Sequence, residues 1–293
     1  VADLDRRSGR YLALPIQRGA RAMAAGQAGE IWLLDGPTSE QEGGVMGLKV
    51  QGQAIEERTG WRFPPLAAGW YREPTYLAAA GRDLCLTDVT HRLQWLDAAG
   101  VALAQTRRPF AAAVAGLPEG DCILARSRQA SSLDDAQDPD VAPVGTQRLT
   151  LERYRRRAEA ATRVWTRDWT EPLAASPPSS LTALAVDAAR ARVIVLDASA
   201  RRLRFFDLAD GAPRGERPLP PAEGFAPWND VDLDGAGRIW VLDFVRPALL
   251  VLDGEGALLR DLPAPSGALR LALLASGDPV VLTAGRELLL LDA

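Results

Sequence analysis

The sequence is poor in the residues that metal and nucleophile chemistry most often uses. It has one histidine, His91, and two cysteines in 293 residues. A zinc site with several histidine ligands is therefore impossible, and a single turn histidine more often stabilises its turn than performs acid–base catalysis. The sequence also has no Gly-x-Ser-x-Gly nucleophile motif, no phosphate-binding loop and no Cys-x-x-Cys pair.

Long apolar runs and an excess of one charge are missing as well. No apolar run approaches the roughly 18–20 residues that a membrane-spanning helix needs. The 34 basic and 38 acidic residues leave a net charge of −4, and Lys49 is the only lysine. We therefore expect no membrane span and do not expect nucleic acid as a partner.

The clearest pattern in the chain is a run of four short strands over residues 227–263. Residues 231–233 alternate, 238–242 and 248–252 are nearly continuous apolar runs, and 257–262 is more polar. Asp-Gly-x-Gly sequences at 234–237 and 253–256 supply the tight turns between them, because glycine adopts positive φ without strain. The pattern predicts a four-stranded antiparallel sheet with two apolar faces, which must pack against similar sheets.

Weaker copies of this unit recur along the chain. The second strand of the unit ends in aspartate in IWLLD 31–35, LCLTD 84–88, VIVLD 193–197 and IWVLD 239–243, with degenerate copies ILARS 123–127 and VVLTA 280–284. A second apolar strand ending in aspartate follows in LQWLD 93–97, LRFFD 203–207, LLVLD 249–253 and LLLLD 288–292. One copy per about 40–50 residues is the spacing of β-propeller blades.

Six copies predict an all-β, six-bladed β-propeller with four-stranded antiparallel blades. The last copy ends at Ala293 after its third strand, whereas an unassigned strand, RYLALPI at 10–16, precedes the first copy. We therefore predict that the N-terminal strand completes the last blade and closes the ring, which removes an open sheet edge. Residues 1–293 are expected to form a single domain, with an inserted loop at about 128–147 in blade three.

Two segments resemble the NHL repeat: Asp197-Ala-Ser-Ala-Arg-Arg-Leu-Arg-Phe-Phe-Asp207 and Asp88-Val-Thr-His-Arg-Leu-Gln-Trp-Leu-Asp97. The resemblance covers blades two, four and five and implies a propeller of the NHL and gluconolactonase-like type. The turn that enters each innermost strand lines one mouth of the central channel. There the resemblance to gluconolactonase-like enzymes implies a divalent metal held by Glu, Asn and Asp from different blades. This chain offers Trp228, Asn229 and Asp230 there in blade five. The other blades offer Ala20-Arg21, Pro74-Thr75, Phe110-Ala111, Leu181-Thr182 and Ala268-Leu269.

One blade cannot supply a cage of three oxygen ligands. We therefore predict no metal, no cofactor and no catalytic residue, and we keep Trp228, Asn229 and Asp230 as candidates at the channel mouth. The alternative for the Asn229 and Asp230 pair is a structural role, in which their side chains bond to the backbone.

Blade three carries the candidates for binding a partner. Four arginines, Arg153, Arg155, Arg156 and Arg157, follow Glu152 within a short segment, and Asp134 and Asp135 lie in the inserted loop. The arginines could form a docking patch for an acidic partner protein or for nucleic acid, of which a protein is the favoured partner. The alternatives are a charged outer strand packed against nearby carboxylates and a solvated loop, and the spacing of the loop aspartates does not match a calcium loop.

The favoured function is a non-catalytic protein-binding or scaffold propeller, an accessory subunit of a larger bacterial assembly that is monomeric outside it. The alternative is a divergent gluconolactonase-like, metal-dependent hydrolase or lyase with a degenerate site. Cys85 and Cys122 fall on second strands of neighbouring blades; we expect buried free thiols, with a disulfide as the alternative. A periplasmic or extracellular location is expected rather than a cytoplasmic one. A chain that begins at Val1 fits a mature secreted protein whose signal was removed, and the alternative is a chain whose start is not represented.

Overall fold

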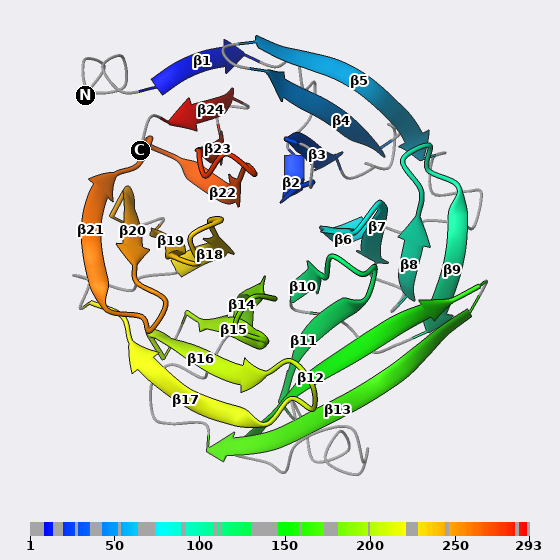
Figure 1. The fold of residues 1–293 in the computed structure, drawn as a ribbon, viewed down its shortest axis with the longest axis vertical. Coiled ribbons are helices and arrows are strands. Elements are labelled where there is room, and N and C mark those ends of the chain that lie inside the picture. The colour runs from blue at the N-terminus through cyan, green and yellow to red at the C-terminus, as the bar shows by residue number, and fades with distance from the viewer. Residues whose placement is uncertain are drawn as a thin grey trace.

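The computed structural model describes residues 9–13, 20–26, 29–35, 43–51, 54–63, 74–88, 92–107, 111, 113–129, 146–158, 160–172, 181–198, 200–220, 228–243, 246–284 and 287–291. These residues form strands and turns only, and the strands are arranged as sheets around a central axis (Figure 1). The described residues include no helix with the length and apolar character needed to cross a membrane. The predicted all-β class is confirmed.

The strands form groups of four, which we call blades and number along the chain. Blade one contains β2 (Ala20–Ala25), β3 (Glu30–Asp35), β4 (Gly43–Gln51) and β5 (Ala54–Phe63). Blade two contains β6 (Pro74–Ala80), β7 (Asp83–Asp88), β8 (Arg92–Leu96) and β9 (Ala102–Arg107). Blade three contains β10 (Ala113–Gly116), β11 (Cys122–Gln129), β12 (Thr146–Arg157) and β13 (Ala160–Pro172).

The second half of the chain repeats this order. Blade four contains β14 (Leu181–Asp187), β15 (Arg192–Asp197), β16 (Arg202–Asp207) and β17 (Pro213–Pro218). Blade five contains β18 (Trp228–Leu233), β19 (Ile239–Asp243), β20 (Ala248–Leu252) and β21 (Leu258–Pro263). Blade six contains β22 (Ala268–Leu273), β23 (Pro279–Thr283), β24 (Glu287–Leu291) and, from the start of the chain, β1 (Gly9–Ala13).

The pairing of β1 with β24 is antiparallel and runs from Gly9 opposite Leu291 to Ala13 opposite Glu287. The N-terminal strand thus completes the last sheet, as predicted, although residues 14–16 of the predicted strand lie outside the described part of the chain. Blades two and three form one eight-stranded sheet, because a single parallel bridge joins Ala160 to Gln105.

Burial explains the order of strands within a blade. The second strands are covered on both faces, so β15, β19 and β23 are buried along their whole length. The fourth strands β17 and β21 lie at the rim and are largely exposed. Each apolar cluster lies between two consecutive blades, and one cluster, which contains Met23, Ile31 and Leu282, joins blade six to blade one.

The recurring aspartates are turn-stabilising residues. Asp88 and Asp243, at the ends of second strands, accept the backbone N–H groups of Arg92 and Arg246. Asp253, at the end of a third strand, accepts the N–H groups of Glu255 and Ala257 through one oxygen, Oδ1. These bonds satisfy turn N–H groups that would otherwise lack partners, so the repeat marker reports local structure.

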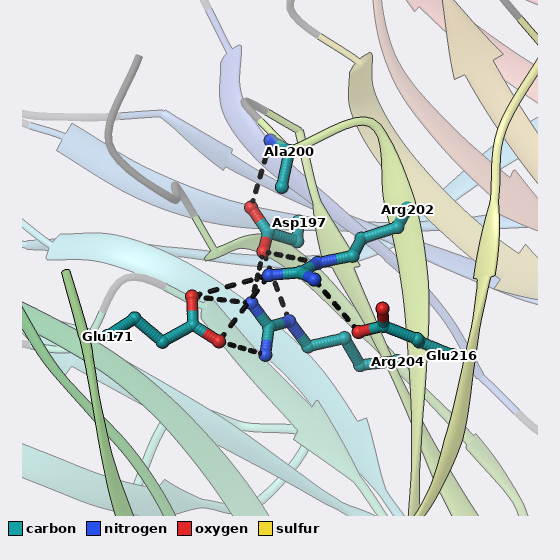
Figure 2. A network of polar contacts seen from close by, with 6 residues as sticks. All are labelled: Glu171, Asp197, Ala200, Arg202, Arg204 and Glu216. Carbon is teal, nitrogen blue, oxygen red and sulfur yellow. Dashed lines mark hydrogen bonds and ion pairs between the residues drawn. The ribbon is translucent and has the colours of Figure 1, made fainter. Parts of the chain in front are cut away.

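Asp197 shows how the same marker also joins two blades. This fully buried carboxylate lies 2.7 Å from Nη2 of Arg204 and 3.3 Å from Nε of Arg202. Both arginines also reach Glu171, on the last strand of blade three (Figure 2). Because the two guanidinium groups lie between two carboxylates, the network connects blades three and four by paired charges.

The two cysteines correct one prediction. Cys85 on β7 and Cys122 on β11 form a disulfide, with their Cα atoms 6.8 Å apart. Both residues are buried in the apolar cluster between blades two and three, beside Trp95 and Tyr154. The expectation of free thiols was wrong, because neighbouring second strands approach closely enough for a bridge.

Candidate functional site

The innermost strands of all blades line a central channel with a volume of about 680 Å³. Alanine is the commonest residue that these strands contribute, as at Ala24, Ala78, Ala115 and Ala185. Small side chains keep the channel open, whereas the few polar side chains stand out along its wall. Blades two, five and six supply Tyr76, Asp230, Asp232 and Arg270, and blade four supplies Thr182, Asp187 and Arg190.

An irregularity near the start of the innermost strands places three of these side chains. The pairing register shifts between Pro74 and Tyr76, between Trp228 and Asp230 and between Ala268 and Arg270. Corresponding shifts occur in β2 and β14. A β-bulge re-aims the side chain that follows it, so these five strands offer equivalent positions at the channel, whereas β10 pairs without a register shift.

The carboxylates of blade five are bonded to blade six. Oδ2 of Asp230 accepts the N–H of Leu271 at 3.0 Å, and Oδ2 of Asp232 accepts the N–H of Leu273 at 2.7 Å. β22 is the last strand of its sheet, so these N–H groups lie on an edge without a neighbouring strand. The second oxygen of each carboxylate accepts the N–H of the next residue in β18. Two side chains therefore satisfy an open strand edge.

Burial changes the titration of both carboxyl groups. Loss of solvent raises the pKa of Asp230 to about 6, although the charge of Arg270 and the two N–H bonds oppose the rise. Burial raises the pKa of Asp232 to about 7, and the neighbouring charge of Asp230 adds to the rise. Both side chains keep partial contact with the channel. A carboxyl group that titrates near neutrality can hold or release a proton under ordinary conditions.

Arg270 and Tyr76 complete the polar wall. Nη1 of Arg270 donates to the carbonyl oxygen of Leu269 at 2.9 Å. Burial raises the pKa of the Tyr76 hydroxyl, and the positive charge of Arg270 acts in the opposite direction. The neutral phenol, a guanidinium and two carboxyl groups could together orient a small polar ligand in the channel.

The metal site that the resemblance implies does not fit these residues. The Asp230 and Asp232 oxygens are occupied by backbone N–H donors. Among the described residues, no group of three or more His, Cys, Asp or Glu side chains is placed to hold a metal ion. Of the three predicted channel-mouth residues, Asp230 faces the channel and takes the predicted alternative role of bonding to the backbone. Trp228 and Asn229 lie on β18, and only their backbone is described.

The arginine segment of blade three lies on the third strand of its blade, where it makes internal ion pairs. Nη2 of Arg153 lies 2.7 Å from Asp121 and 2.8 Å from Glu119, and Arg155 lies 3.1 Å from the same Asp121. Arg156 pairs with Asp83 of blade two at 2.9 Å. Arg157 is exposed. The structure thus places carboxylates beside three of the four arginines, and Asp134 and Asp135 lie outside the described residues.

Sequence reasoning missed Asp232, Arg270 and Tyr76. The sequence does hold a signal for them, because each lies one or two residues beyond the stretch expected to enter the channel. The expected entry residues Thr75, Asn229 and Leu269 are the ones that the register shift skips. The bulge moves the channel-facing position to the next residue, and a bulge is not visible in the pattern of apolar residues.

Comparison with known proteins shows the fold. No protein-family model matches the chain, and no curated protein matches it. Among solved structures, a streptogramin B lyase is similar over 97% of this chain and 96% of its own, with 10% identity and a TM-score of 0.60. A gluconolactonase from Xanthomonas campestris is similar over 98% of this chain and 95% of its own, with 13% identity and a TM-score of 0.54. BamB from Moraxella catarrhalis is similar over 94% of this chain and 86% of its own, with 11% identity and a TM-score of 0.51. The chain therefore resembles β-propeller proteins at the level of the fold.

Proposed function

We propose that the chain is a non-catalytic protein-binding or scaffold β-propeller, an accessory subunit of a larger bacterial assembly. Residues 1–293 form one domain of six blades, and β1 closes the ring on blade six. The pairing of β1 with β24 supports this arrangement, as does the apolar packing between blades six and one. A rigid ring of this kind presents its loops and rim strands to other macromolecules.

The observation that carries the proposal is the use of the channel carboxylates. Asp230 and Asp232 together receive four backbone N–H bonds, so the main acidic groups of the channel wall stabilise the ring. The outer strands of the blades expose more surface to a partner protein than the channel wall does. The hairpin of β12 and β13 has strands of 12 and 13 residues, and most of β13 is exposed.

The blade-three hairpin is the proposed docking surface. The exposed Arg157 ends β12 beside the turn to β13, and Arg153, Arg155 and Arg156 of the same strand pair with neighbouring carboxylates. Asp134 and Asp135, in the chain segment between β11 and β12, are the second part of the proposed surface. Figure 1 shows the hairpin along the outer rim beyond the inner strands of blade three. An extended hairpin of this length can contact a partner without disturbing the ring.

The disulfide supports a location outside the cytoplasm. Cys85 and Cys122 are fully buried and bridged. Structural disulfides form and persist in oxidising compartments, and cytosolic proteins seldom have them. We therefore propose a periplasmic or extracellular protein.

A pull-down from the native organism tests the proposed function. Three baits would be compared: the intact protein, a variant in which a short Gly-Ser linker replaces residues 130–145, and the variant Arg157→Glu. Gln129 of β11 and Gln147 of β12 are paired, so a short linker can rejoin these two strands. We expect a stoichiometric partner that is lost or weakened with the two blade-three variants and retained with Arg82→Glu, a change at an exposed arginine of blade two. Absence of any partner would contradict the proposal.

A divergent hydrolase or lyase is the second candidate, because two channel carboxyl groups titrate near neutrality. An acid–base reaction would use Asp232 as the proton donor or acceptor, with Arg270 orienting the substrate. A panel of lactones assayed with wild type and Asp232→Asn tests this role. Turnover that is lost in a folded variant would support an enzyme, and the same null result for both proteins would oppose it.

A further inference from the structure

We propose that the outer edge of β13 binds an extended segment of the partner protein as an added β-strand. That the added strand belongs to a partner protein rests on the proposed function, whereas the open edge is a property of β13 itself. In Figure 1, β13 is the outermost strand of blade three. It has 13 residues, whereas the other outer strands β1, β5, β9, β17 and β21 have between five and ten.

The outer edge of β13 lacks a neighbouring strand over most of its length. β12 pairs with the inner edge along the whole strand. On the outer edge β9 contributes one parallel bridge, between Gln105 and Ala160, and within the described residues no strand pairs beyond it. Every second residue of 161–172 therefore directs its main-chain N–H and C=O groups to an open edge that is roughly 40 Å long, at about 3.4 Å per residue.

The side chains along this edge are exposed and favour strand pairing. Thr162, Thr166 and Thr170 are exposed β-branched residues, a type that fits a pleated sheet. Val164 is 41% exposed and is one of four exposed large apolar side chains in the described part of the chain. It is the extra residue where the register with β12 shifts, so it pairs with no residue of β12. An apolar β-branched side chain at a sheet edge is suited to contact with an added strand.

Natural sheet edges are usually protected against added strands, and β13 has few of the protecting features. β17 carries Pro213, Gly215 and Pro218 within its six residues, and β21 ends in Pro263. Residues 160–171 of β13 include no proline, glycine or lysine. Proline lacks an N–H group, and short or proline-containing strands offer little edge to a partner. Among the outer strands, β13 is therefore the best suited to pairing.

The charges of β13 are engaged by other strands. Three of its four charged side chains form ion pairs: Arg163 with Glu152 at 3.2 Å, Asp168 with Arg148 at 2.6 Å, and Glu171 with Arg202 at 3.3 Å. Arg167 is the one charged side chain of the strand without an ion pair among the described residues. Charges bound to neighbouring side chains protect an edge less than free ones, so the main-chain groups stay accessible.

The bridge to β9 shows that a strand fits at this edge. Gln105 of blade two bridges to Ala160, and β9 ends at Arg107. An added segment would extend along the same edge from that point, so the docking surface is continuous with an existing contact between blades. Because the edge offers main-chain groups, its occupant is an extended chain with β-branched or aromatic residues and no proline.

A fluorescent peptide with the sequence of residues 146–155 is the probe for this edge. This segment belongs to β12, the strand that pairs with β13 inside the blade, so its side chains complement those of β13. The control peptide carries Leu151→Pro, which keeps the length and the charge but removes an N–H group and interrupts a strand. We expect the first peptide to bind and the proline peptide to bind roughly tenfold more weakly, as the loss of one or two hydrogen bonds predicts.

Two double variants of the protein locate the binding. Val164→Lys with Thr166→Lys places two lysines on the open edge, and Leu258→Lys with Leu259→Lys places two on exposed positions of β21. Lysine on an edge discourages strand addition, so the peptide should bind the first variant roughly tenfold more weakly and the second like wild type. Hydrogen exchange on wild type needs no variant. The bound peptide should slow exchange at every second amide of residues 161–171.

Failure of the peptide to bind, or equal weakening by both double variants, would overturn the proposal, because general charge effects would explain the second result. Peptide binding without alternate protection in β13 would overturn it too. If light scattering shows a dimer of the protein that Val164→Lys with Thr166→Lys disperses, the occupant is a second copy and not a partner protein.

The pull-down separates this proposal from the proposed function. A partner that is retained by Val164→Lys with Thr166→Lys would exclude the edge and leave the proposed function in place. Specific binding of the peptide to β13 without any partner in the pull-down would contradict the proposed function, and the edge would remain competent to accept a strand.

Discussion

We call the contact between two neighbouring blades a seam. Different interactions stabilise the seam between blades two and three and the seam between blades five and six. A buried disulfide joins β7 to β11 at the first seam, beside Trp95 and Tyr154. Hydrogen bonds from β22 to the carboxylates of Asp230 and Asp232 join the second. The first seam depends on oxidation and is insensitive to pH near neutrality, whereas the second depends on protonation. The two contacts between blades therefore respond to different chemical conditions.

The largest effect should come from removing the disulfide. Closing a 37-residue loop lowers the entropy of the unfolded chain, which stabilises the fold by about 4 kcal/mol. We expect Cys85→Ala with Cys122→Ala to lose about that free energy of unfolding, measured by urea denaturation. The reduced wild type is the matched control. An unchanged midpoint after complete reduction would mean that apolar packing alone holds this seam.

A third seam, between blades three and four, sharpens the comparison because its charges are fully paired. Removing a buried ion-pair partner costs about 3 kcal/mol, since the remaining charges stay buried. Asp197→Ala should therefore lose about this much stability, as Arg202 and Arg204 lose their buried carboxylate. Asp197→Asn, which keeps the shape, should recover part of the loss. A loss below 1 kcal/mol would show that Glu171 alone satisfies both arginines.

The carboxylate seam should respond to pH. The pKa of Asp232 rises from 3.8 to about 7 on folding, so the folded state retains a proton that the unfolded state releases. The resulting stabilisation is complete below pH 4 and is lost as the pH rises through about 7. Each pKa unit corresponds to 1.36 kcal/mol, and contact with channel water reduces the full value to about 2 kcal/mol.

The measurement compares wild type with Asp232→Asn between pH 4 and pH 8. The difference is needed because Asp168, Asp207 and Asp234 have lowered pKa values and destabilise the fold as the pH falls. We expect the stability of wild type relative to the variant to fall as the pH rises. A difference that is flat across this range would remove the contrast between the two seams.

The smallest effect should come from Glu216, at the exposed side of the Asp197 network (Figure 2). Its carboxylate lies 2.9 Å from Arg202 and is 54% exposed. Exposed ion pairs contribute about 0.5 kcal/mol, so Glu216→Ala should change the unfolding midpoint only slightly. A loss close to that of Asp197→Ala would mean that the network acts as one unit.

The repeating part of the fold was predictable from the sequence. The aspartates that end second and third strands recur because each accepts turn N–H groups, as Asp88 and Asp253 do. The unpaired N-terminal strand was predictable as well, because the last blade was one strand short. Turn hydrogen bonds and the number of strands depend on residues that are close together in the sequence, so both can be predicted from the sequence alone.

The partners of side chains across seams were not predictable. Cys85 and Cys122 looked like separate buried thiols. The sequence allowed the arginine segment to be a docking patch or a strand packed against carboxylates, and it did not identify Asp121 and Asp83 as the partners. Tyr76 and Arg270 escaped notice because bulges shift the channel-facing position. These features depend on the distance between blades, which apolar periodicity does not encode.

The pairing of β1 with β24 has a consequence for the order of folding. Gly9 is opposite Leu291, so β1 is synthesised long before the strand that it pairs with. Early in synthesis β1 has no native neighbour, and blade six cannot be completed until residues 287–291 leave the ribosome. Contacts of such long sequence separation form slowly, because a large loop must close first. Between the release of β24 from the ribosome and its pairing with β1, both strands would be open to pairing with another copy of the chain.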